Sequence, residues 1–294
     1  MPPQSKLEKN FLLIEARMAK AKDRIFTRQA LEEIFESLRE EGLVSVRNKA
    51  DNFIQLLIGN KYLRAITING PSDIQRYITG NVSDFEIALS IAFCTTISHV
   101  SALLVHGFSL NSSRKIFITQ EQSEKRTKPT FLLQENVDSA FSKPQRPSNS
   151  VYTWKNNQIY LLKGKKSGNL GCIQKQYQNA RIYVTDLEKT LLDITVRPGY
   201  AGGVGNVMKA YIEAKGIISV RKLYDYLKRM EFIYPYHQAI GFFLQYAGYT
   251  NKEIGLFRSL PKEIDFYLDY YNSEKFYNSD WRIYVPPQFA KLEI

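Results

Sequence analysis

The chain is poor in the residues that most often carry disulfides, metal ions and acid–base catalysis. Its 294 residues include only two cysteines and three histidines. Two cysteines cannot build the disulfide framework of a small secreted domain, and Cys94 lies in an apolar run, where a buried thiol behaves as a small hydrophobic side chain. No two of Cys94, Cys172, His99, His106 and His237 have the tight spacing of metal ligands. We therefore expect no structural disulfide and no metal site.

Long apolar runs are also missing. No stretch approaches the ~20 consecutive apolar residues needed to span a bilayer, and residues 1–5 lack the basic flank and apolar core of a secretion signal. An apolar share of 44% with 23% charged residues is typical of a globular protein, and the length suffices for two domains. We expect a cytoplasmic protein with no membrane partner.

Acidic residues are fewer than basic ones, 29 against 40, so the formal net charge is +11. The surplus is concentrated in residues 114–181, called here the basic span. Its acidic side chains are Glu121, Glu124, Glu135 and Asp138, and its basic side chains are Arg114, Lys115, Lys125, Arg126, Lys128, Lys143, Arg146, Lys155, Lys163, Lys165, Lys166, Lys175 and Arg181. Such a surplus favours a polyanionic partner through counterion release and steering, although a basic surface also serves solubility alone.

Sequence motifs of catalysis are not found. A phosphate-binding loop needs Lys and Ser or Thr directly after its glycines; residues 202–206 offer neither, and residues 163–167 lack the glycine spacing. No Ser or Cys lies in a nucleophile elbow. Residues 186–189 approximate a nuclease composition, but Glu and Lys are adjacent and lie in a helical pattern. We expect a protein that is not an enzyme and that has no cofactor.

The first eighty residues have the periodicity of a winged helix. The expected elements are a helix over 6–21, a short strand at 25–26, a helix over 28–42 capped by Thr27, a helix over 50–59, and strands at 63–68 and 76–79 around the turn Asn69-Gly70-Pro71. Helix, strand, helix, helix and hairpin is the element order of a winged helix. Residues 1–80 are therefore predicted to be a DNA-binding domain, with a small helical interaction domain as the alternative.

The third helix of this unit would be the DNA reader. Amide side chains pair bidentately with adenine in a major groove, and basic side chains at the helix start and the wing base hold phosphates. The side chains expected to contact DNA are Arg47, Asn48, Lys49, Asn52, Gln55, Lys61 and Arg64. Asp51, on the same face, is a poor fit against phosphate.

Residues 81–294 mix helical and strand patterns, which predicts an α+β domain. Helices are expected over 85–93, 99–105 and 130–141 and through most of 186–257. Strands are expected at 115–119, 151–154, 158–162, 172–177 and 181–184, and the aromatic tail at 266–271 and 281–285 is expected to close the domain as strands.

Residues 184–203, called here the central motif, have an explicit helix start and stop. Thr185 and Glu188 have the spacing of a capping box, and Pro198 bars the helix from continuing before a glycine turn into a second helix. The apolar face carries Leu187, Leu191 and Ile194, and the opposite face carries Asp186, Lys189, Thr190, Asp193 and Arg197. That charged face is either a solvated surface or an interaction or intramolecular clamp surface, in which Arg197 and Tyr200 are suitable anchors.

The central motif resembles the core motif of the AbiEi family, the antitoxins of bacterial abortive-infection (type IV) toxin–antitoxin systems. Residues 97–108, a Ser-rich helix ending in His-Gly, and residues 234–242 are similar to other family segments, so the resemblance runs from about residue 25 to the C-terminus. The motif residues carried over are Thr185, Asp186, Glu188, Lys189, Thr190, Asp193, Arg197, Pro198, Tyr200, Gly202 and Gly203.

The resemblance implies two jobs in phage defence. The winged helix would repress its own promoter by binding inverted repeats, as a monomer in solution that occupies DNA cooperatively, and the second domain would counteract a nucleotidyltransferase toxin without needing a stable complex with it. Two alternatives stay open. One is an RNA-binding protein that uses the basic span, and the other is a transcriptional regulator with no toxin.

Overall fold

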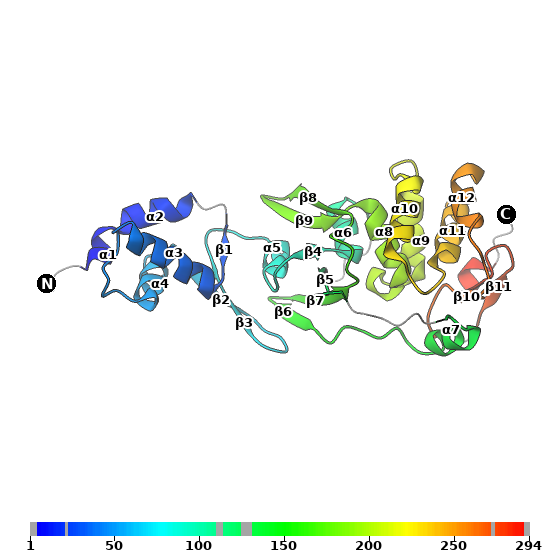
Figure 1. The fold of residues 1–294 in the computed structure, drawn as a ribbon, viewed down its shortest axis with the longest axis horizontal. Coiled ribbons are helices and arrows are strands. Elements are labelled where there is room, and N and C mark those ends of the chain that lie inside the picture. The colour runs from blue at the N-terminus through cyan, green and yellow to red at the C-terminus, as the bar shows by residue number, and fades with distance from the viewer. Residues whose placement is uncertain (1–4, 21–22, 110–113, 125–130, 272–273, 291–294) are drawn as a thin grey trace.

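The computed structural model describes residues 5–20, 23–109, 114–124, 131–271 and 274–290. It confirms the α+β fold class. The molecule is elongated, with a helical N-terminal unit at one end, a six-stranded sheet in the middle and a group of helices at the other end (Figure 1). Within the described residues, every helix is too short or too polar to cross a bilayer.

The N-terminal unit has the predicted order of elements. Its helices are α1 (Lys6–Lys9), α2 (Phe11–Ala19), α3 (Arg28–Glu40) and α4 (Ala50–Gly59), and its strands are β1 (Ile25–Phe26), β2 (Arg64–Ile68) and β3 (Ile74–Ile78). The strands form an antiparallel sheet in the order β1-β3-β2. Thr27 caps α3 as predicted, because its hydroxyl oxygen accepts the amide of Ala30 at 3.0 Å. Phe35, Phe53 and Leu57 lie at the centre of the core.

The prediction of one helix over residues 6–21 was wrong. The chain leaves the helix at Asn10, which separates α1 from α2. The Asn10 backbone still makes i,i+4 hydrogen bonds with Lys6 and Ile14, of 3.1 and 3.0 Å, but its φ and ψ of −96° and 9° depart from the helix, and its side-chain amide donates to the carbonyl of Leu43 at 2.7 Å. Ala21 lies outside the described residues.

The central sheet is built from β4 (Thr95–Ile97), β5 (Lys115–Glu121), β6 (Val151–Trp154), β7 (Asn157–Gly164), β8 (Cys172–Tyr177) and β9 (Ala180–Thr185). Its order is β6-β7-β5-β4-β9-β8, and within this sheet β5 pairs with β7 and β4 with β9 in parallel, while the other described pairs are antiparallel. Side chains alternate between the faces. Ile116 and Ile118 therefore lie on one face, and Phe117, Thr119 and Glu121 on the other.

The N-terminal hairpin packs against the isoleucine face. Together with α5 (Asp84–Leu89), it covers this face, and Ile66 and Ile68 of β2 share one buried cluster with Ile118. The hairpin tip is joined to β6, because Asn69 and Thr153 exchange backbone hydrogen bonds of 2.7 and 3.1 Å. The hairpin is thus part of the core of the sheet, and residues 81–294 alone would leave that core uncovered.

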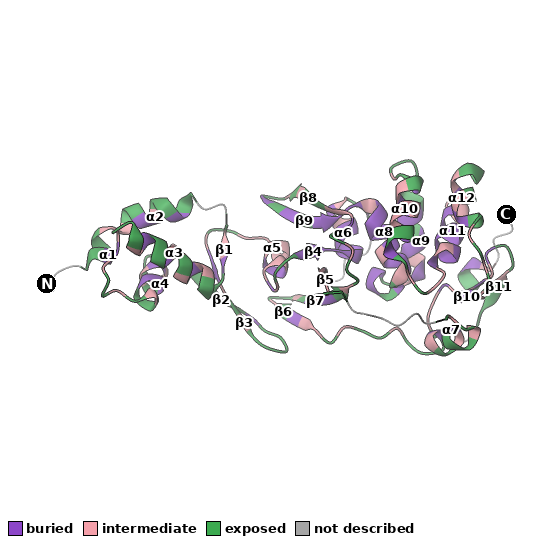
Figure 2. Cartoon of the chain, viewed as in Figure 1, coloured by how far each residue is buried: buried purple, intermediate pink, exposed green. Residues whose placement is uncertain are grey.

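The other face of the sheet lies against α6 (His99–Val105) and α8 (Leu187–Val196), and further helices pack behind them: α9 (Val204–Glu213), α10 (Val220–Met230), α11 (Tyr236–Tyr246) and α12 (Asn251–Arg258). Buried positions run through the sheet and these helices in Figure 2. Helix α7 (Gln134–Phe141), the 3-10 turns at Pro198–Ala201 and Pro287–Phe289, and a small sheet of β10 (Phe266–Tyr267), β12 (Ile283–Val285) and β11 (Phe276–Asn278) complete the fold.

Several other boundaries differ from the predictions. Helix α5 ends at Leu89 instead of residue 93, because Arg76 takes the carbonyl of Ser90 at 2.9 and 2.5 Å. Helix α7 begins at residue 134, and Thr130 lies outside the described residues. Strands β4 and β11 were not predicted. Cys94 is exposed, so the prediction of a buried thiol there was wrong.

Candidate functional site

Most of the predicted DNA-contacting side chains lie exposed on and beside α4. Lys49, Asn52 and Gln55 are exposed on the helix and at its start, and Arg47, Lys61 and Arg64 are exposed on the flanking segments. The opposite face of the helix buries Phe53, Ile54 and Leu57 in the N-terminal core. Helix α4 lies at the end of the molecule remote from the helical group (Figure 1), so its polar face is accessible to a large partner.

Two residues of this region are engaged within the protein. The side-chain oxygen of Asn48 accepts the amide of Ser45 at 3.0 Å, and the residue is half-buried. Asn48 therefore shapes the loop before α4 more than it presents a free amide. Asp51 pairs with Arg28 at 2.6 Å, and this pairing offsets the negative charge that made Asp51 a poor fit beside phosphate.

The central motif starts differently from the predicted capping box. Asp186, not Thr185, is the N-cap of α8, and its carboxylate accepts the amide of Lys189 at 2.8 Å. The Thr185 hydroxyl instead lies 2.7 Å from that of Thr190, inside the protein. Of the two alternatives for the charged face, a solvated surface does not describe its first turn, because Asp186, Lys189 and Thr190 are buried, as is Glu188.

One part of the motif holds α8 against α10. Asp186 accepts a hydrogen bond from the Tyr226 hydroxyl at 2.8 Å, and Lys222 lies 3.0 Å from both Asp186 and Glu188. Glu188 also accepts the amide of Ser219, the N-cap of α10, at 2.9 Å. Burial opposes the charge of Lys222, but the two carboxylates raise its pKa, and burial together with the bond to Asp186 raises the pKa of Tyr226 to about 12. These residues form an intramolecular clamp.

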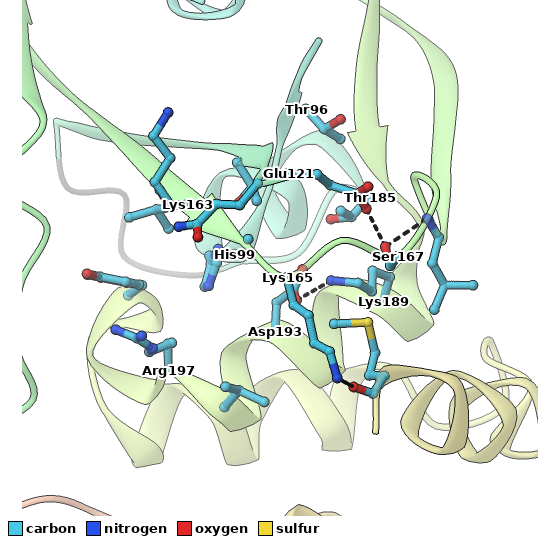
Figure 3. Close-up of a pocket in the computed structure, with 18 of the residues that line it drawn as sticks. Thr96, His99, Glu121, Lys163, Lys165, Ser167, Thr185, Lys189, Asp193 and Arg197 are labelled. Atoms are coloured by element: carbon cyan, nitrogen blue, oxygen red, sulfur yellow. Dashed lines mark hydrogen bonds and ion pairs between the residues drawn. The ribbon is translucent and has the colours of Figure 1, made fainter. Parts of the chain in front are cut away.

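The other part of the motif lines a cavity of about 610 Å³ between the sheet and α8. Its floor includes a row of register partners on three strands: Thr96 of β4, Thr119 of β5 and Leu162 of β7. Helix α8 and the turn that follows it contribute Lys189, Asp193, Arg197 and Tyr200, and the segment before α11 contributes aromatic side chains. Figure 3 shows the motif residues facing this space.

Lys189 and Asp193 form an ion pair in the cavity wall, with side chains only 10% and 13% exposed. His99 lies nearby, and its Nδ1 is 2.9 Å from the Ser98 hydroxyl. Burial lowers the pKa of His99 to about 4; the Asp193 carboxylate opposes this change weakly, whereas the cations Lys189 and Arg197 lower the pKa further. At neutral pH this imidazole is uncharged. The sequence placed His99 as a capping or polar core residue, and its position beside the central motif was not predicted.

Glu121 is the second carboxylate of the cavity. It accepts hydrogen bonds from the Ser167 hydroxyl and from the amides of Gly168 and Asn169 at 3.1 and 3.0 Å. Burial alone would raise the pKa of Glu121, but these hydrogen bonds lower it. The basic glycine turn of residues 163–169 is therefore a cradle that holds Glu121 ionised.

Arg197 lies apart from the Lys189–Asp193 pair (Figure 3). Among the described residues its guanidinium has no hydrogen-bonding or ion-pair partner. Burial raises the pKa of Tyr270, and the positive charge of Arg197 opposes that change, which places this charge beside the aromatic wall. Pro198 starts the 3-10 turn that carries Tyr200, and Gly202 and Gly203 have φ angles of +85° and +103°, which only glycine adopts readily.

Three basic side chains of the basic span line the cavity: Arg146, Lys163 and Lys165. Lys163 donates to the Gln120 side chain at 2.5 Å, and Lys165 donates to the carbonyls of Met230 and Glu231 at 2.6 and 2.9 Å. Lys125, Arg126 and Lys128 lie outside the described residues. The described part of the chain holds no group of three or more His, Cys, Asp or Glu side chains arranged for a metal ion.

Comparison with known proteins gives the fold only. No protein-family model matches the sequence, and no curated protein matches it either. Among solved structures, the chain is similar to the crystal structure of the Rv2827c protein from Mycobacterium tuberculosis, with a TM-score of 0.56 and 12% sequence identity over 92% of this chain and 89% of that one. The similarity extends over both the N-terminal unit and the larger part of the chain.

Proposed function

We propose that the protein binds promoter DNA through α4 and acts as an antitoxin through its larger α+β part. The observation that carries the DNA-binding half is the exposure of Asn52 and Gln55 on the outer face of α4, flanked by exposed basic side chains. A helix of this kind fits a major groove, where amide side chains read adenine and basic side chains hold phosphates. The net charge of +11 favours the same partner.

The position of the hairpin modifies how the winged helix would meet DNA. Because the tip at Asn69 is hydrogen-bonded to Thr153, phosphate contacts from the hairpin would come from its base, where Lys61 and Arg64 are exposed. A protein that binds inverted repeats would then present α4 to the groove, with the larger part of the chain held rigidly behind it.

The antitoxin half is supported by the resemblance of the central motif and by its arrangement. Most of the motif residues are buried, whereas Arg197 is exposed and has no partner among the described residues. A toxin from the neighbouring gene, a nucleotidyltransferase, is the proposed functional partner, with or without a stable complex. Induction of the adjacent gene alone distinguishes this proposal from a regulator with no toxin. If cells that express that gene grow without inhibition, the antitoxin part of the proposal is wrong.

The DNA-binding half is tested with the double variant Asn52→Ala and Gln55→Ala. Each bidentate base contact contributes about 1–3 kcal/mol of discrimination, so the variant should lose at least about tenfold in preference for its operator over unrelated duplex. Nonspecific affinity should persist, because the basic side chains remain. Fluorescence anisotropy with both duplexes measures this, and Gln29→Ala, which removes an exposed amide on α3 without a change in charge, is the control. Equal selectivity of wild type and the α4 variant would refute the assignment.

A further inference from the structure

The cavity beside the central motif has an excess of positive charge. Its cationic side chains are Arg146, Lys163, Lys165, Lys189 and Arg197, and its carboxylates are Glu121 and Asp193, so five positive charges face two negative ones. Both carboxylates are already satisfied by the protein, Asp193 by Lys189 and Glu121 by Ser167 and two backbone amides. The remaining charge is available to an anion.

Two of the cations have unused donors. Arg146 and Arg197 line both the cavity and an adjoining hollow beside α7, and neither side chain has a hydrogen-bonding or ion-pair partner in the described part of the chain. Lys163, Lys165 and Lys189 donate to protein oxygens. A guanidinium presents paired N–H donors in a plane, which matches the oxygens of a phosphate.

Part of the cavity lining is aromatic. Phe232, Tyr234 and Tyr270 line the cavity and are only half-buried, so ring surface is left for a ligand. A flat, π-rich group stacks on such rings whatever its hydrogen-bonding pattern. The volume of about 610 Å³ lies within the range of small-molecule sites.

We propose that this cavity binds a nucleotide, with the phosphate held by Arg146 and Arg197 and the base against Phe232, Tyr234 and Tyr270. The same chemistry is offered by a free mononucleotide and by the terminal nucleotide of an RNA strand. The site is separate from α4, so it does not rest on the proposed DNA binding, and loss of operator selectivity would leave it unaffected.

The test is calorimetric titration of the full chain with AMP, GMP, CMP and UMP, with adenosine and inorganic phosphate as fragments. At least one nucleotide should bind, and removal of its phosphate or its base should weaken binding at least about tenfold. Arg197→Ala should cause a similar loss, and Arg229→Ala, an exposed arginine on α10 outside the cavity lining, should cause none. Thermal melting confirms that both variants fold.

RNAs of five nucleotides with a 5′-phosphate, a 3′-phosphate or neither distinguish a free mononucleotide from the end of an RNA strand as the ligand. Tighter binding of a phosphorylated RNA than of any mononucleotide assigns the site to strand ends, and the reverse assigns it to free nucleotides. The proposal is overturned if no nucleotide or RNA binds at millimolar concentration, if inorganic phosphate binds as tightly as nucleotides, or if Arg197→Ala binds like wild type.

Discussion

Asp193 and Arg197 lie four residues apart in the central motif, yet their replacement should affect stability very differently. The Asp193 carboxylate is 13% exposed and paired with Lys189, which is 10% exposed. Asp193→Ala leaves the Lys189 ammonium buried without its partner, and removing one member of a buried pair costs about 3–5 kcal/mol of unfolding free energy. Arg197 makes no hydrogen bond or ion pair with the described residues, so its removal leaves no buried charge unpaired. Arg197→Ala should therefore change the unfolding free energy by less than about 0.5 kcal/mol.

Urea denaturation followed by circular dichroism measures both variants. The combined replacement Lys189→Met with Asp193→Leu removes both charges and should recover most of the stability that Asp193→Ala loses, because apolar side chains of similar size replace a buried pair at little cost. The reasoning is refuted if Asp193→Ala loses less than about 1 kcal/mol, or if the double replacement is no more stable than Asp193→Ala. Loss of antitoxin activity in Asp193→Ala would therefore report unfolding, and Arg197→Ala is the cleaner functional probe.

Burial lowers the pKa of His99 to about 4 from 6.5, so the unfolded chain binds a proton that the folded one excludes, and stability falls as pH drops below 6.5. The unfolding free energy should fall by about 2 kcal/mol by pH 5. Asparagine tolerates the φ of +53° at this position, so in urea titrations His99→Asn should lose less unfolding free energy than wild type between pH 7 and pH 5. Equal losses in both proteins would contradict the burial of a neutral His99. Gly241→Ala places a Cβ 2.1 Å from the buried ring of Trp281 and should cost about 1–3 kcal/mol, whereas Gly255→Ala in open space on α12 should add about 0.5–1 kcal/mol. Thermal melting of the two glycine variants compares them directly, and similar shifts would count against this packing.

The N-terminal unit was predictable because residues close in sequence mark where its helices and strands begin and end. Thr27, Gly42 and the turn at Asn69 start or stop elements with side chains and backbone conformations that act within a few residues. The break at Asn10 was not predicted; the Asn10 side chain bonds to a carbonyl 33 residues away, a contact that local periodicity does not reveal. Strand β4 was missed for a similar reason: its three residues are all buried, so they show no alternation.

The cavity could not be predicted from spacing. The sequence identifies the charged residues of the central motif, but it does not show which of them are paired with other residues inside the protein. Asp186 and Glu188 are occupied by Lys222, a residue more than thirty positions away, and Arg146 and Lys163 reach the same space from other segments. Such groupings depend on tertiary packing, which helical periodicity does not reveal.

Growth rescue tests the proposal that DNA binding and protection use different surfaces of one chain. Cells would express the adjacent gene from an inducible promoter, together with the full-length protein, its Asn52→Ala and Gln55→Ala variant, or its Arg197→Ala variant, at matched protein levels. We expect the α4 variant to restore growth as wild type does, and Arg197→Ala to fail to restore it. Rescue by Arg197→Ala, or failure of the α4 variant to rescue, would contradict the proposal.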